Sequence, residues 1–139
     1  MRRKARALLL QALYQWEVSK NSAREILQGF LSEINFKKVD AVFFEQEFLE
    51  IVEKQKFIDE KFTSFLDRPI EQLDLVELTI LRIGTYEITV AMIPYKVAIN
   101  EALELSKKFG SVDGYRFINK VLDRLSQTNG YKDEKVKEL

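Results

Sequence analysis

Hydrophobic residues surround almost the whole circumference of one predicted helix, residues 74–90 (DLVELTILRIGTYEITV). Asp74 is an expected N-cap, and Glu77 follows three residues later, as a capping box requires. Gly84 lowers helix propensity, so we expect a close-packed neighbour at that position. A helix that is apolar in nearly every direction is buried among other helices, and this one is too short and too charged to span a membrane.

Amphipathic segments on both sides of this helix have the residue spacing of α-helices. They cover approximately residues 1–20, 22–34, 40–54, 57–66, 94–109 and 113–125. Ser22, Asp40 and Asp113 are expected N-caps. The pattern predicts an all-α protein, a compact bundle of about seven helices around the buried central helix. We expect residues 1–126 to form a single helical domain and the polar residues 127–139 to form a C-terminal tail.

Composition narrows the possible functions. The chain has 139 residues, 22 of them basic and 22 acidic, and it has no cysteine and no histidine. It therefore lacks thiolate metal ligands and the commonest general base. We find no nucleotide-binding loop, metal-ligand cluster or nucleophile–base set, so we expect no catalytic residues, cofactor or metal. Without a signal peptide or transmembrane segment, a cytoplasmic protein with no membrane partner is expected.

Zero net charge means that any nucleic-acid site must be a local patch. One such patch precedes the first acid, Glu17, and its cations are Arg2, Arg3, Lys4 and Arg6. Cations at a helix N-terminus oppose the helix dipole, which suggests that they serve an anionic ligand. With Tyr14 on the same helix, RNA fits this pattern, because phosphates take guanidinium groups and an aromatic face takes a base. A solvated, frayed N-terminus is the alternative.

A second candidate lies on the last predicted helix. Phe117 falls about 90° from the centre of the apolar face, beside Lys120 and Arg124. A half-exposed ring flanked by cations is a possible base-stacking site. An ordinary phenylalanine at the edge of the core is the alternative.

Three blocks of sequence carry a family resemblance: RRKARALLLQALYQWE, LDLVELTILRIGTYEI, and IPYKVAINEALELSKKFG followed by YRFINKVLDRL. Together they extend over most of residues 2–125 and strongly resemble the NusB family of transcription antitermination factors. The resemblance implies an all-helical, non-enzymatic protein that binds the boxA element of nascent RNA together with NusE, a small-ribosomal-subunit protein. Within an antitermination complex, that pair helps RNA polymerase to read through terminators, notably during ribosomal RNA synthesis.

The resemblance also implies roles for individual residues. Arg2, Arg3 and Arg6 match the family's arginine-rich N-terminal segment, which contacts RNA. Tyr14 matches the tyrosine of its ALY motif. Glu77 matches the glutamate of the VE motif in the central helix, a position linked to the NusE surface.

The closing motif of the family, of the KFVNGVL type, is matched with two departures. Phe117 matches its phenylalanine and Asp113 the acid just before the motif, and both lie near RNA in the family. Lys120 replaces the usual glycine, so it can add a phosphate contact or change the local helix packing. Gly114-Tyr115 replaces a more usual polar pair.

Other functions remain open at this point. A helical protein–protein adaptor without an RNA site would leave the N-terminal cations incidental. A module of the kind fused to RNA methyltransferases is disfavoured, because no catalytic domain follows the helices. The protein can be a monomer or a homodimer.

Overall fold

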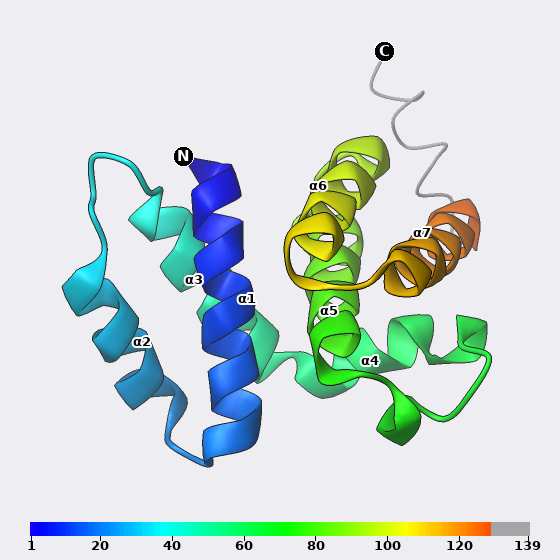
Figure 1. Cartoon of the computed structure of the whole chain (residues 1–139), viewed down its shortest axis with the longest axis horizontal. Helices are drawn as coiled ribbons and strands as arrows, with labels where there is room; N and C mark the ends of the chain where they lie inside the picture. Colours follow the sequence, from blue (N-terminus) through cyan, green and yellow to red (C-terminus); the bar gives the residue numbers. More distant parts are fainter. Residues whose placement is uncertain (129–139) are drawn as a thin grey trace. The chain divides into compact units, whose positions relative to one another are not determined.

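The structure is a computed structural model that describes residues 1–128, and all of its regular elements are helical (Figure 1). The seven α-helices are α1 (Arg2–Ser19), α2 (Ala23–Glu33), α3 (Ala41–Glu53), α4 (Gln55–Phe62), α5 (Leu75–Thr89), α6 (Tyr95–Phe109) and α7 (Val112–Gln127). Two short 3₁₀ helices, η1 (Thr63–Phe65) and η2 (Ile70–Gln72), separate α4 from α5. The predicted all-α fold of about seven helices is confirmed. Within residues 1–128, no helix is long and apolar enough to cross a membrane.

The chain forms two compact units, Met1–Gln55 and a second unit that begins at Lys56. The first unit contains α1, α2 and α3, with α1 packed on both of the others. The local sequence determines where α2 and α3 begin, because the side chains of Ser22 and Asp40 accept hydrogen bonds from the backbone N–H groups of Glu25 and Phe43. Each capping residue lies three positions before the residue whose N–H it accepts from, so both N-caps can be predicted from the sequence alone.

In the second unit, α5 packs against α6 and α7. Eleven consecutive residues of α5, 78–88, are buried, as the apolar pattern of this helix predicts. At Gly84, α5 comes close to both α6 and α7. A Cβ added there would lie 2.7 Å from Leu122 Cδ1 on α7 and 3.6 Å from Ala102 Cβ on α6. The expectation of a close-packed neighbour at Gly84 is confirmed.

A buried charge on α5 is paired rather than isolated. Arg82, 7% exposed, donates from Nε and Nη2 to the two carboxylate oxygens of Asp59 on α4, each at 2.9 Å. Two parallel hydrogen bonds suit the planar guanidinium and the carboxylate. This pair fixes α4 against α5, and breaking it would leave a charge in a poorly hydrated place.

The start of α7 differs from the expectation that Asp113 caps this helix. Ser111 is the N-cap, and its hydroxyl accepts a hydrogen bond of 3.0 Å from the Gly114 N–H. Asp113 instead lies in the first turn, where its negative charge still suits the helix dipole. Of the predicted tail, Gln127 ends α7 and Thr128 is its C-cap, whereas residues 129–139 lie outside the described part of the chain.

The contact at Gly84 predicts that Gly84→Ala lowers the free energy of unfolding by about 1–2 kcal/mol, because the overpacking cost exceeds the gain in helix propensity. Gly29→Ala in α2 is the matched control. Nothing lies within 4 Å of a Cβ added there, so this change should stabilise by about 0.5–1 kcal/mol. Urea unfolding followed by circular dichroism measures both. Equal stabilisation by the two changes would contradict the close approach at Gly84.

Candidate nucleic-acid interface

Three of the four N-terminal cations, Arg2, Arg3 and Lys4, are exposed on the first turn of α1. The Arg2 guanidinium also has a counter-ion, Asp40, which lies far from it in the sequence. Its Nε lies 3.6 Å from Asp40 Oδ2, at the N-cap of α3. The Arg2 side chain is still 60% exposed, so this ion pair is weak and leaves the cation accessible.

Arg6 differs from the other N-terminal cations because only 5% of it is exposed. Its Cζ lies 4.9 Å from the centroid of the Phe43 ring, and Arg2 Cζ lies 4.6 Å from the same centroid. Phe43 on α3 is thus a shared aromatic support for two arginines. Arg6 therefore has a structural role, which the sequence did not reveal because the apolar pattern of α3 does not show that Phe43 contacts an arginine of α1.

Tyr14 lies about three turns after Arg3 on α1 and is 40% exposed. A tyrosine of this exposure is partly supported by the helix surface and partly open to a ligand. α1 therefore presents two kinds of group suited to single-stranded RNA, namely cations in its first turn and an aromatic ring further on.

The second group of predicted residues lies on α7. Phe117 is half-buried, and Asp113 and Lys120 are exposed. The cation that contacts the ring is Arg68, from the turn between η1 and η2, with its Cζ 4.8 Å from the Phe117 centroid. The sequence pattern pointed to Lys120 and Arg124 beside this ring. Arg68 was missed because it is 49 positions away in the chain and only the tertiary fold brings it there.

Glu77, in the first turn of α5, lies against the first turn of α7. A Cβ added to Gly114 would be only 2.8 Å from Glu77 Oε2, so a larger residue at position 114 would displace this carboxyl. Burial raises the pKa of Glu77, the nearby carboxylates of Asp74 and Asp113 raise it further, and Arg68 opposes the rise. The proposed partner-binding carboxyl and the ring on α7 thus share one electrostatic environment.

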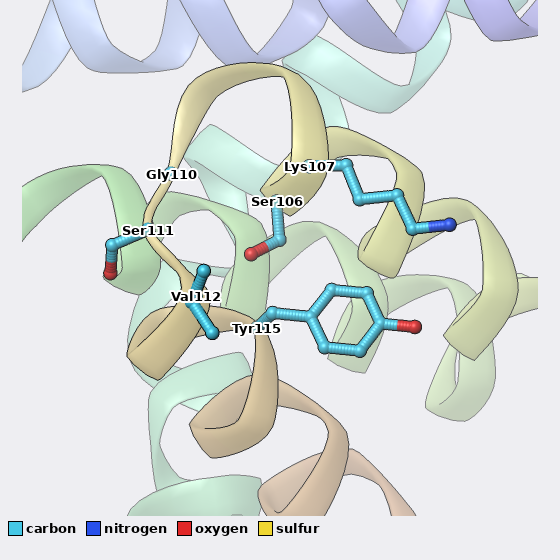
Figure 2. A pocket seen from close by; sticks show the side chains of 6 residues that line it. All are labelled: Ser106, Lys107, Gly110, Ser111, Val112 and Tyr115. Carbon is cyan, nitrogen blue, oxygen red and sulfur yellow. The ribbon is translucent and has the colours of Figure 1, made fainter.

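A pocket of about 360 Å³ lies where α6 ends and α7 begins (Figure 2). Its walls are formed by Ser106, Lys107, Gly110, Ser111, Val112 and Tyr115. The Ser106 hydroxyl is buried and has no hydrogen-bond partner among the described residues. The Lys107 ammonium lies 5.8 Å from the centroid of the Tyr115 ring. The pocket combines a ring, a cation and an unsatisfied hydroxyl, and no sequence motif pointed to it.

An all-α protein with exposed cations on one helix and a cation-stacked ring on another has the features of a helical RNA-binding protein. No group of three or more acidic side chains within residues 1–128 is arranged to hold a metal ion. The comparison with protein families identifies the class. The NusB family model matches residues 3–127, and the chain belongs to the NusB family. This is a family of transcription antitermination factors, which are non-enzymatic RNA-binding proteins.

Individual relatives agree with this assignment. The chain is 45% identical to the transcription antitermination protein NusB of Shewanella halifaxensis over 92% of this chain and 96% of that protein. It is 45% identical to the protein of the same name from Idiomarina loihiensis over 91% of this chain and 92% of that protein. Among solved structures, T. maritima NusB superposes with a TM-score of 0.86 at 26% identity, covering 99% of this chain and 97% of that one. The chain thus has a role in transcription antitermination and acts with RNA and the transcription machinery.

The unsatisfied hydroxyl in the pocket predicts that Ser106→Ala raises the free energy of unfolding by about 1–2 kcal/mol, since a buried polar group without a partner is costly. Ser126→Ala on α7 is the matched control, because Ser126 is equally buried but donates to the Leu122 carbonyl at 2.8 Å. Its hydroxyl is satisfied, so its loss should bring no comparable gain. Urea midpoints that rise equally in the two variants would refute the difference.

The raised pKa of Glu77 predicts a pH-dependent effect of Glu77→Gln on stability. The folded protein binds this proton more tightly than the unfolded chain does, so the stabilising contribution is present below the ordinary glutamate pKa of 4.5 and is lost as pH rises through the folded-state pKa. Glu77→Gln should therefore be more stable than the wild type at pH 7, and its advantage should shrink toward pH 5. Urea unfolding at both pH values measures this. Glu60→Gln, which removes an exposed carboxyl from α4, is the charge control. A larger advantage of Glu77→Gln at pH 5 would reverse the sign of the argument.

Proposed function

We propose that this protein binds a boxA-type element of nascent RNA together with NusE and promotes read-through by RNA polymerase, notably in ribosomal RNA transcription in the cytoplasm. The observation that carries the proposal is the exposed pair Arg2 and Arg3 on the first turn of α1 in a member of this family. The names of its relatives, transcription antitermination protein NusB, support the role in read-through.

The proposed mechanism divides the work between charges and rings. Arg2, Arg3 and Lys120 hold phosphates, and they position the strand without reading its sequence. Tyr14 and Phe117 offer faces to unpaired bases, a kind of contact that suits single-stranded RNA.

Two of the proposed RNA-binding residues have narrower roles. Arg6 contributes least to direct contact, because only 5% of it is exposed, and it acts mainly by stacking on Phe43. The Asp113 carboxylate is exposed and can only accept hydrogen bonds, from base amino groups or ribose hydroxyls.

Partner binding is proposed to involve Glu77. A site with few RNA contacts has modest affinity, and a partner that adds contacts of its own to the same RNA raises it by linking two binding events. In this mechanism NusE occupies the surface near Glu77 and extends the RNA site. The net charge of zero fits this division, since the whole chain does not attract RNA by itself.

The test is a titration of labelled boxA-type RNA, and of a scrambled RNA, with and without NusE at two salt concentrations. The wild type should prefer the boxA-type RNA, and NusE should increase that preference. Arg2→Ala combined with Arg3→Ala should weaken binding and reduce the slope of log affinity against log salt by about 1.4, because each lost phosphate contact contributes about 0.7 for a single strand. These two arginines are chosen because Arg6 is buried and its removal would also affect folding.

Arg24→Ala, which removes an exposed arginine from α2, is the matched control and should leave the salt dependence unchanged. Circular dichroism should show equal helix content in all variants. Binding to NusE without any preference between the two RNAs would favour a protein–protein adaptor instead. Wild-type affinity in the double variant would remove the N-terminal patch from the site.

A further inference from the structure

The face of Phe117 that the proposed function assigns to RNA is not empty, because the Arg68 guanidinium lies on it. The distance from Arg68 Cζ to the ring centroid is 4.8 Å. Arg68 comes from the turn between η1 and η2, whereas Phe117 is in the second turn of α7. Any base that approaches this side of the ring meets the guanidinium first.

Several observations show that this cation is available to a ligand. The Arg68 side chain is 42% exposed, and its ion pair with Asp67 joins Nε and Oδ1 over 3.6 Å while Asp67 itself is 66% exposed. Such a surface pair holds a cation only weakly. An exposed cation–ring contact is also weak, so the fold does not depend on it. Arg68 is therefore accessible, supported on one side by a ring, and dispensable for folding.

The surroundings restrict how RNA can approach. Asp67, Asp74, Glu77 and Asp113 are carboxylates near Arg68, and Arg68 is the cation that opposes the rise in the pKa of Glu77. Without a cation over the Phe117 ring, an RNA strand that approached this ring would meet these carboxylates. With Arg68 over the ring and Lys120 exposed one turn further on α7, the same approach meets two cations.

We propose that Arg68 is a further RNA-contacting residue, whose guanidinium is held between the Phe117 ring and an unpaired base and so extends the aromatic stack by one layer. This inference rests on the proposed function, in which Phe117 contacts RNA. Arginine suits the position because its guanidinium is flat and stacks on aromatic faces, whereas the lysine ammonium is a compact, strongly hydrated charge. Stacking of this kind tolerates any base, since every base has a π-face.

The experiment compares Arg68→Ala and Arg68→Lys in binding to labelled boxA-type RNA, at two salt concentrations. Both variants should bind about tenfold more weakly than the wild type, the loss typical of one stacked base. Arg68→Lys should keep the wild-type salt dependence because the charge remains. Arg24→Ala is the matched control and should bind as the wild type does. Thermal melting should show that all variants are folded.

A double-mutant cycle with Phe117→Leu tests whether the two residues act as one stack. Combining Phe117→Leu with Arg68→Ala should cost much less affinity than the two single losses multiplied, because each change alone already breaks the stack. Full affinity in Arg68→Lys would show that only the charge matters and would overturn the stack. Full affinity in Arg68→Ala would remove Arg68 from the site.

The failure of this inference is distinguishable from that of the proposed function. If the wild type prefers boxA-type RNA and loses affinity with Arg2→Ala and Arg3→Ala, but Arg68 and Phe117 contribute independently, only the inference about the stack is wrong. If the wild type does not distinguish boxA-type from scrambled RNA, the proposed function is wrong, and the assignment of Arg68 is overturned with it.

Discussion

The enclosure of α5 is the constraint on which the second unit depends. A helix with apolar side chains in nearly every direction has no face that it can leave in water, so residues 78–88 are all buried. Enclosure then imposes its own requirements. The lack of a side chain at Gly84 leaves room for the Leu122 side chain of α7, and the buried charge of Arg82 is paired with Asp59 of α4. The packing of α4, α6 and α7 thus follows from the composition of a single helix.

Features set by near neighbours in the chain could be predicted from the sequence. Asp74, Asp40 and Ser22 each accept from the N–H three residues ahead, which is a relation that a sequence displays directly. Asp113 shows the limit of this reasoning. Both Ser111 and Asp113 are good N-cap residues, so the local sequence did not decide between them, and in the structure Ser111 is the N-cap.

The candidate residues could be placed on their helices from the sequence, but the residues that they contact could not be predicted. The positions of Arg2, Arg6 and Phe117 on their helices follow from helical spacing, yet their partners come from elsewhere in the chain. Asp40 and Phe43 meet the arginines of α1, and Arg68 meets Phe117. The N-terminal cations are adjacent in the sequence but differ in the structure, because Arg6 is buried whereas Arg2 remains largely exposed. A run of like charges therefore does not define a site until its exposure is known.

Zero net charge gives these local contacts their importance. A strongly basic protein can hold RNA by its overall field, but this chain has to place each cation where a phosphate or base will meet it. Around Phe117 the charges oppose one another, since the carboxylates of Asp113 and Glu77 repel phosphates and the Arg68 guanidinium attracts them. In the proposed mechanism, a partner that covers Glu77 would remove part of this repulsion. Partner and RNA would then assist each other through electrostatics as well as through shared contacts, and thermodynamic linkage requires that such assistance be mutual.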